Sequence, residues 1–155
     1  MIRFAELCDI EGINVIHEQL HIQHIGYRPD IFAPIEQPVF DSLMKEYLTA
    51  ENKRIIVSEN DGVIDGYAAV TICDTSKGAG EILPFKFIEV NEFSVLQGCG
   101  NRHIGTDMMD FVKAFAKEQG AKFVELSVHA ENTGAQEFYK AKGFNVKTLK
   151  MQYTV

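Results

Sequence analysis

The 155-residue chain has the length of one compact domain, and with 46% hydrophobic residues and 11 Phe it can build a sizeable core. Acidic side chains outnumber basic ones by 22 to 15, and no segment gathers the basic residues into a stripe that could neutralise the phosphates of a duplex. We therefore expect a single domain over residues 1–155 and no nucleic-acid partner.

The first 49 residues predict a short strand followed by two helices. The strand spans Ile2–Leu7, and Asp9 stands at the N-cap of a helix that fades near Gly26. Three prolines in the segment up to Pro38 exclude regular helix there, because each removes a backbone donor and restrains its predecessor. Apolar residues at helical spacing then predict a second helix over Phe40–Thr49.

The rest of the chain predicts a hairpin and then alternating strands and helices. Strands Arg54–Val57 and Val63–Ile72 are joined by Asn60-Asp61-Gly62, which supplies the positive φ angles of a tight turn. The further elements are a loop at Thr75–Gly80, a strand at Phe85–Val95, a helix from Met108 to Gly120, a strand at Phe123–Val128, a helix at Thr133–Ala141 and a strand at Asn145–Tyr153. This order, β-α-α-β-β-β-α-β-α-β, predicts a mixed α/β domain.

The cysteines and the distribution of apolar residues indicate the cellular compartment in which we expect the protein. Cys8, Cys73 and Cys99 are odd in number and contain no CxxC pair, which argues against a disulfide framework and a structural zinc site. The first residues lack the apolar core of a signal peptide, and nowhere do about 18 apolar residues run together. We expect a cytoplasmic protein with reduced thiols and no membrane contact.

The turn Asn101–Thr106, between a strand and a helix, is a candidate phosphate site. The first turn of a helix offers unpaired N–H groups, and its dipole attracts anions. Gly105 permits close approach of a diphosphate to the backbone, and Arg102 can add a charge-assisted contact. Taken alone, this is a weak signal, because a Gly before a helix more often reflects ordinary turn chemistry.

A second segment, residues 132–144, reads locally as a capped helix in which Asn132 caps, Ala135 and Phe138 pack and Gly143 terminates. Together with the turn, however, it resembles the GNAT superfamily of N-acetyltransferases, which keeps an Asn-x-x-Ala-x-x-Phe-Tyr-x-x-x-Gly-Phe segment downstream of its phosphate loop. The pattern is matched at Asn132, Ala135, Phe138, Tyr139, Gly143 and Phe144. The resemblance covers essentially the whole chain.

The resemblance implies a central, mostly antiparallel sheet with a splayed parallel pair, flanked by about four helices. It implies acetyl-CoA as co-substrate, with its pantetheine arm between strands 85–95 and 123–128, and acetyl transfer to a primary amine of a small molecule or protein in a ternary complex. The residues implied to contact the cofactor are Phe93, Ser94, Val95, Gly100, Asn101, Arg102, His103, Ile104, Gly105, Thr106, Asn132, Ala135, Phe138 and Tyr139. A homodimer formed through the strand Val146–Val155 is a further expectation from the resemblance.

The phosphate loop departs from the superfamily pattern in two places. Gly100 stands where an Arg or Gln is usual, and His103 stands at the first Gly, so that only Gly105 matches. Because the superfamily binds pyrophosphate mainly through loop N–H groups, we expect weakened rather than abolished binding. Preference for another acyl-CoA and a non-catalytic acyl-CoA-binding module are the alternatives.

Acetyl transfer needs a neutral amine, a donor for the oxyanion and a proton for the departing thiolate. The resemblance assigns Tyr139 as the acid and the Val95 N–H as the oxyanion donor, although Tyr139 also reads as aromatic packing beside Phe138. Glu89 and Glu92 are the candidate bases. Their odd separation puts them on opposite faces of a strand unless a bulge intervenes, and either carboxylate also reads as an ordinary solvated side chain.

The first helix contains His17-Glu18-Gln19-Leu20-His21, which fits the zinc-binding pattern H-E-x-x-H. With His24, these histidines fall within about 60° around a helix. A zinc metalloprotease is therefore an alternative function, although it leaves the phosphate turn and segment 132–144 unexplained. The preferred interpretations are packing beside the apolar stripe or a place at the acceptor cleft, and no metal is expected.

Overall fold

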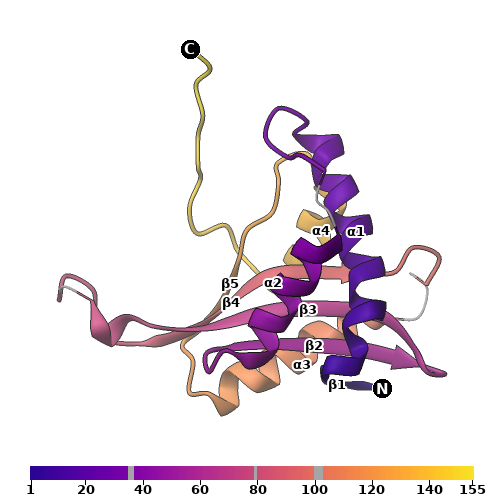
Figure 1. Ribbon diagram of the computed structural model, residues 1–155. Coiled ribbons are helices and arrows are strands. Elements are labelled where there is room, and N and C mark those ends of the chain that lie inside the picture. Colours follow the sequence, from indigo (N-terminus) through magenta and orange to yellow (C-terminus); the bar gives the residue numbers. More distant parts are fainter. Residues whose placement is uncertain (35–36, 79, 100–102) are drawn as a thin grey trace.

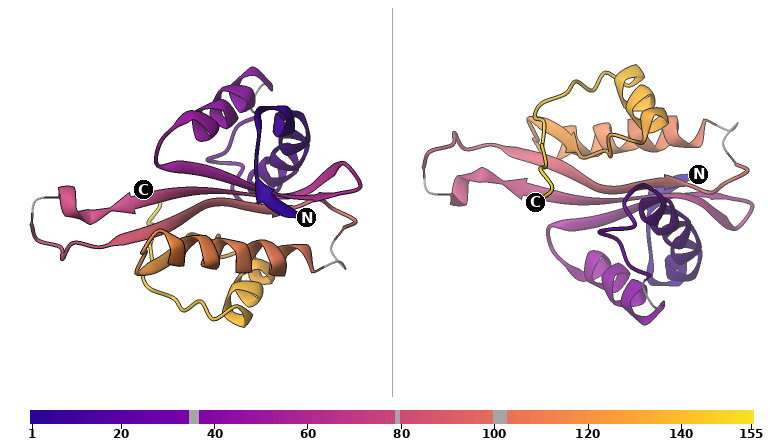
Figure 2. Two further views of the ribbon diagram at one scale, coloured as in Figure 1. Left: turned by 90° about the horizontal axis from the view of Figure 1, so that it is seen from below. Right: turned by 90° about the horizontal axis from the view of Figure 1, so that it is seen from above.

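The computed structural model describes residues 1–34, 37–78, 80–99 and 103–155, with the backbone alone for residues 37–40. One sheet lies between two helical layers, with α1 and α2 on one face and α3 and α4 on the other (Figures 1 and 2). The elements are β1 (Ile2–Phe4), the 3-10 helix η1 (Leu7–Asp9), α1 (Ile10–Tyr27), α2 (Gln37–Thr49), β2 (Lys53–Asn60), β3 (Val63–Asp74), the 3-10 helix η2 (Thr75–Lys77), β4 (Lys86–Val95), α3 (Ile104–Glu118), β5 (Phe123–Leu126) and α4 (Thr133–Ala141). The predicted mixed α/β class is confirmed.

The sheet runs in chain order from β1 to β5, and its strands are antiparallel except for the β4–β5 pair. That parallel pairing covers only Phe87–Val90 of β4 against the whole of β5. Beyond Val90, β4 continues to Val95 while its registered pairing with β5 has ended. The two strands therefore part at the end of β4 nearest to α3, which is the splayed pair that was expected.

The alternation of side chains along the strands builds a core on each face of the sheet. Towards α3, Ile56, Val70 and Ile88 pack against the apolar stripe of the helix, which includes Met108 and Val112. Towards α1 and α2, the buried set is Ile13, Ile16, Leu20, Met44, Ile55, Val57, Tyr67 and Ala69. The predicted β2–β3 turn is also present, with Asp61 and Gly62 at φ of 52° and 78°.

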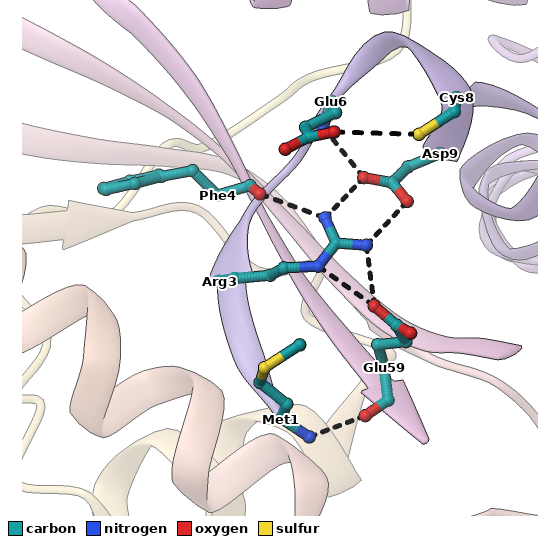
Figure 3. A network of polar contacts seen from close by, with 7 residues as sticks. All are labelled: Met1, Arg3, Phe4, Glu6, Cys8, Asp9 and Glu59. Carbon is teal, nitrogen blue, oxygen red and sulfur yellow. Dashed lines mark hydrogen bonds and ion pairs between the residues drawn. The ribbon is translucent and has the colours of Figure 1, made fainter. Parts of the chain in front are cut away.

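The N-terminal end of α1 is fixed to the sheet by an ionic network around Arg3 (Figure 3). The guanidinium donates to both carboxylate oxygens of Asp9, at 2.6 and 2.9 Å, and to Glu59 at 2.7 Å. Asp9 stands at the predicted N-cap, but its carboxylate accepts from the Glu6 N–H and Arg3 instead of capping α1. This network sets the position from which α1 crosses the sheet.

Two predicted boundaries are wrong by a few residues. β1 ends at Phe4 because the chain turns into η1, whereas the predicted strand reached Leu7. α2 begins at Gln37, so that Pro38 lies in its first turn. The first turn of a helix has no intrahelical partner for its N–H groups, and a proline there loses no hydrogen bond.

The predicted last strand, Asn145–Tyr153, is wrong. The described residues after α4 form no strand, and β5 is the last strand of the sheet among the described residues. A strand requires a neighbouring edge that accepts its hydrogen bonds, and alternation of side chains alone does not provide one. The segment instead touches the body through Lys147 on Glu125, at 2.6 Å, and through Gln152, which accepts from Arg28 at 3.0 Å.

None of the helices in the described ranges is both long and apolar enough to pass through a lipid bilayer.

Candidate active site

The predicted phosphate turn leads into α3, although Gly100, Asn101 and Arg102 lie outside the described residues. His103 is the N-cap of α3 and adopts φ 57° and ψ 13°, and its carbonyl accepts from the N–H of Asp107 at 3.0 Å. This left-handed conformation favours Gly and costs other residues about 1–2 kcal/mol. The residue that replaces the usual first Gly of the superfamily loop, His103, therefore occupies a position whose backbone conformation favours glycine.

Residues predicted to contact a cofactor meet beside the start of α3. Phe93 of β4 lies 5.9 Å from Phe138 and 6.2 Å from Tyr139, both of α4, between ring centroids. A Cβ placed on Gly105 would lie 3.5 Å from Phe138 and 3.7 Å from Phe93. α4 begins at this location because Asn132 caps it by accepting from the Ala135 N–H at 3.1 Å. Three elements distant in sequence thus converge on Gly105.

Tyr139 lies within this aromatic group. Its ring contacts Phe93, Phe138 and Phe144 edge to face, with centroid distances of 5.4 to 6.2 Å. Burial raises the pKa of Tyr139 to about 12, because the charged phenolate is poorly solvated there. The phenol therefore remains protonated at neutral pH. Packing accounts for its position, and its predicted role as an acid stays a prediction.

The end of β4 presents backbone groups towards the gap left by β5. The Leu96 N–H donates to the Asp65 carbonyl at 2.9 Å, so Leu96 and Asp65 form a hydrogen-bonded pair. Because antiparallel pairs alternate, the N–H groups of Phe93 and Val95 point away from β3. The Val95 carbonyl accepts from the side chain of Gln19 at 3.1 Å. The predicted oxyanion donor, the Val95 N–H, therefore points towards the splayed side of β4.

A β-bulge decides the orientation of the two candidate carboxylates. Ala69 pairs with Glu92 but Val70 pairs with Val90, so Asn91 is an extra residue in β4. Residues that pair directly across a sheet share a face. Glu92 pairs with Ala69 and Glu89 pairs with Thr71, and these two partners lie two residues apart on β3. The bulge therefore puts both carboxylates on the face that carries α1 and α2.

Only Glu92 joins a buried polar group. Tyr67 donates its O–H to Glu92 Oε2 at 2.6 Å, and His17 Nδ1 lies 2.9 Å from the same oxygen and 2.8 Å from the Tyr67 hydroxyl. His17 is 5% exposed and Tyr67 is fully buried, whereas the side chain of Glu92 retains 27% exposure. Glu89 is exposed, with the Cys73 thiol 3.9 Å from its Oε2. The Glu92 carboxylate thus combines fixed partners with access to solvent.

The ionisation of this group follows from its contacts. Burial by itself raises the pKa of Glu92, but the hydrogen bonds from His17 and Tyr67 and the charge of His17 outweigh it, and the pKa lies below its ordinary value. Burial, and then the charge of Glu92, raise the pKa of Tyr67 well above 10. A neutral phenol therefore donates to a carboxylate that is ionised at neutral pH.

The three histidines of α1 diverge and do not converge on one point. His17 faces Glu92, the His21 Nε2 lies 2.6 Å from the Ala33 carbonyl, and the His24 ring lies 5.2 Å from that of His129. Burial and the neighbouring His129 lower the pKa of His24. Within the described part of the chain, no group of three or more His, Cys, Asp or Glu side chains could hold a metal. The zinc alternative gains no support.

Sequence reasoning missed Tyr67, Gln19 and His129 as members of this site. The sequence could have indicated Tyr67, because a phenol in an otherwise apolar buried strand needs a hydrogen-bond partner. The partner could not be named, because Glu92 approaches Tyr67 only through the register and bulge of β4. Gln19 and His129 carried no local signal, and they join the site through the packing of α1 and the segment after β5.

Comparisons with known proteins agree with this architecture. The profile described as the acetyltransferase (GNAT) family matches residues 20–144. An uncharacterized N-acetyltransferase of Methanocaldococcus jannaschii is 42% identical over 61 residues, which cover 39% of this chain and 27% of that protein. One of Mycobacterium tuberculosis is 31% identical over 101 residues, covering 65% of this chain and 58% of that protein. The chain thus matches less than two thirds of the length of either relative.

Two solved structures share the fold. A mutant protein of Bacillus halodurans superposes with a TM-score of 0.94 at 21% identity, covering 100% of this chain and 99% of the other. The aminoglycoside N-acetyltransferase AAC(6')-Iy in complex with CoA superposes with a TM-score of 0.79 at 18% identity, covering 100% of this chain and 93% of the other. At these identities the similarity is one of fold.

Proposed function

The chain belongs to the acetyltransferase (GNAT) family, and we propose that it moves the acetyl group of acetyl-CoA to a primary amine by direct attack within a ternary complex. The observation that carries this proposal is the Glu92 carboxylate, held by His17 and Tyr67 on the strand that splays from β5. It is an ionised and partly exposed group beside the gap that the proposed cofactor would occupy.

Coenzyme A is assigned to the gap between β4 and β5 and to the start of α3. AAC(6')-Iy, which shares the fold, is known in complex with CoA and with a bisubstrate analogue that contains CoA. In this chain, the outward N–H of Phe93 can bond the pantetheine arm, and the first turn of α3 at Gly105 offers donors to the pyrophosphate. These groups support acetyl-CoA as the co-substrate.

Glu92 would receive the proton that the amine loses. An amine attacks as the neutral species, and once its nitrogen has bonded to the acetyl carbon it carries a positive charge and becomes strongly acidic. A carboxylate with a lowered pKa is a weak base towards a free ammonium but suffices for this acidic nitrogen. His17 and Tyr67 would hold the carboxylate in position without contacting the amine.

Val95 and Tyr139 would act at the other end of the reacting bond. The Val95 N–H would donate to the oxyanion that forms when the thioester carbonyl is attacked. Tyr139, which remains protonated up to a pH of about 12, would supply a proton to the thiolate of CoA as the carbon–sulfur bond breaks. The products are the acetylated amine and free CoA.

The acceptor would be a small molecule or protein that carries an amine and is cationic in solution. Glu89 and Glu92 lie on one face of β4, and their negative charges favour a positively charged acceptor there. AAC(6')-Iy is an aminoglycoside acetyltransferase, and aminoglycosides belong in a screen of acceptors for this chain together with polyamines and peptide amines.

The test compares Glu92→Gln with Glu89→Gln, two identical changes on the same face of one strand. With the best amine from the screen, we expect kcat for Glu92→Gln to fall by about 10²–10⁴-fold, the range for loss of a general base, while CoA affinity is retained. Glu89→Gln should stay within a few-fold of wild type. Equal activity of the two variants would remove Glu92 from the mechanism.

The same screen separates the enzyme from a binding module, which the unusual phosphate turn favours as the second candidate. Free thiol released from acetyl-CoA in the presence of an amine measures turnover directly. If acetyl-CoA raises the melting temperature of the wild-type protein while no amine of the panel releases thiol, the chain is an acyl-CoA-binding module and the proposed catalysis is refuted.

A further inference from the structure

Four aromatic side chains that the proposed catalysis does not use meet at the C-terminal end of α1. The ring of Phe32 lies 5.2 Å from that of His24 and 5.6 Å from that of His129, between centroids. His24 and His129 are 5.2 Å apart, and Tyr27 lies 6.0 Å from His129. These four residues, here called the ring cluster, are all half-buried, so each keeps a surface that a ligand can contact.

The ring cluster joins α1 to the segment that follows β5. That segment approaches the C-terminal end of α1 (Figure 1), and it contributes His129 to the cluster. The last registered pair of β4 and β5 is Val90 with Leu126, and counted from that pair Phe93 and His129 are each three residues further along. The ring cluster therefore bridges the two strands on the α1 side at the level where they have parted, which is the level of Glu92.

The ring cluster and Glu92 lie along one face of α1. His17, which lies 2.9 Å from Glu92, and His24 are seven residues apart, so they share a face of the helix and are separated by about 10 Å along its axis. Burial and then the charge of His129 lower the pKa of His24, and the opposite effect of Glu92 is smaller. His24 therefore presents a neutral ring at neutral pH, two helical turns from the level of the carboxylate.

The ring cluster and the Glu92 carboxylate fit the two ends of one small molecule. Aromatic rings contact one another with centroids about 5 Å apart, so a ligand ring against the cluster would lie about 5 Å from the level of Glu92. A short chain of carbon atoms covers that distance and carries an amine to the carboxylate. We propose that the ring cluster determines acceptor specificity and that the acceptor is a primary amine joined through a short carbon chain to an aromatic ring. The inference rests on the proposed function and adds the chemical class of its acceptor.

Solvation favours this class of acceptor over other amines. An aromatic ring gains by leaving water and packs against the rings of the cluster, whereas a row of hydroxyl groups or a second ammonium would leave water for rings that offer it no carboxylate. The single ammonium group of the acceptor is drawn to the ionised Glu92 instead. Aminoglycosides and polyamines should therefore be poorer acceptors than an amine that carries one aromatic ring.

The test compares the acetylation of 2-phenylethylamine, spermidine and kanamycin by the full chain with acetyl-CoA. We expect kcat/KM for 2-phenylethylamine to be at least about tenfold higher than for the other two amines. Phe32→Leu keeps an apolar side chain but removes one ring, and it should raise KM for 2-phenylethylamine about threefold to tenfold with kcat retained. Phe85→Leu is the matched control, because Phe85 is also half-buried and lies 5.5 Å from the ring of Phe123, next to the start of β4. The control should change neither constant.

A second pair of variants separates the ring of His24 from its imidazole chemistry. His24→Leu should raise KM for 2-phenylethylamine as Phe32→Leu does, because it also removes one ring. His24→Phe restores a ring and should return KM to within about twofold of wild type. If His24→Leu raises KM and His24→Phe fails to restore it, the imidazole itself is needed, and the role assigned to the rings is overturned.

Calorimetric titration of 2-phenylethylamine into the protein with bound CoA keeps this inference distinct from the proposed function. If amines are acetylated but spermidine or kanamycin is preferred, or if Phe32→Leu leaves KM unchanged, the ring cluster does not select the acceptor, and the proposed acetyl transfer stands. If no amine is acetylated, the proposed function fails and binding alone decides. Binding that Phe32→Leu weakens and Phe85→Leu does not would support the ring cluster, whereas binding that neither variant changes, or no binding, would overturn it.

Discussion

Gly105→Ala separates the needs of the fold from those of the proposed cofactor. The added Cβ would lie 3.5 and 3.6 Å from two atoms of the Phe138 ring and 3.7 Å from Phe93, which are ordinary van der Waals contacts. The protein without ligand therefore accommodates the methyl group. Because alanine is favoured over glycine within a helix, stability should stay unchanged or rise by up to about 1 kcal/mol.

The same Gly105→Ala change should weaken the binding of CoA. If the pyrophosphate approaches the first turn of α3, the methyl group holds it away from one donor, and a hydrogen bond to a charged group contributes about 1.5–3 kcal/mol. Since each 1.4 kcal/mol corresponds to a tenfold change, CoA should bind about tenfold to a hundredfold more weakly.

Thermal melting measures the first effect and calorimetric titration with CoA the second. Gly26→Ala, in α1, is the matched control, because its Cβ would meet no atom within 4 Å and it makes the same glycine-to-alanine change within a helix. It should show no loss of CoA affinity. A Gly105→Ala protein that binds CoA as tightly as wild type would show that the start of α3 does not hold the phosphates.

Three further outcomes follow. Asp9→Asn should lower the free energy of unfolding by about 2 kcal/mol at pH 7 through loss of the ionic bonds to Arg3. The hydrogen bonds of Arg3 hold the pKa of Asp9 in the folded protein below its ordinary value. The stability that these bonds contribute is therefore present above the ordinary pKa range of Asp and is lost as the pH falls through the folded pKa. If urea melts below that pKa still show a difference between Asp9→Asn and wild type, this explanation is contradicted. Tyr139→Phe keeps the aromatic packing and should lower kcat at least tenfold, and unchanged turnover would remove Tyr139 as the acid. His103→Gly should raise the melting temperature and leave CoA affinity equal or higher, because it relieves the left-handed strain at φ 57°; a lower melting temperature would show that the His103 side chain stabilises the turn.

Most of the helices and strands could be predicted from residues close together in the sequence. The helix Thr133–Ala141 could be predicted with its ends because Asn132 caps it and Gly143, at φ 87°, terminates it within one turn. The β2–β3 turn followed likewise from Asp61 and Gly62. In each case the interactions that define the element lie within a few residues of one another, and the sequence displays them directly.

The last strand shows the limit of that reasoning. Residues 148–155 alternate as a strand should, yet alternation reports only which side chains could share a face. Whether a ladder forms depends on an edge with free hydrogen-bonding groups, and the nearest such edge, β5, lies more than 20 residues earlier in the chain. The strand Phe123–Leu126 was predicted with nearly its observed ends, but not its place at the edge of the sheet.

The sequence by itself determined the class of the fold, because the order of its strands and helices can be recognised from local patterns. The resemblance of Asn132 to Phe144 and of the turn before α3 to the GNAT pattern pointed to the residues that gather near Gly105. The tertiary structure decided which of the two carboxylates is held in a buried polar group. The sequence around Glu89 and Glu92 does not distinguish the two carboxylates. Glu92 contacts His17 and Tyr67 because Asn91 is an extra residue in β4 and because α1 crosses the sheet at this place. A pKa depends on neighbours in space, and those neighbours stand 75 and 25 residues away along the chain.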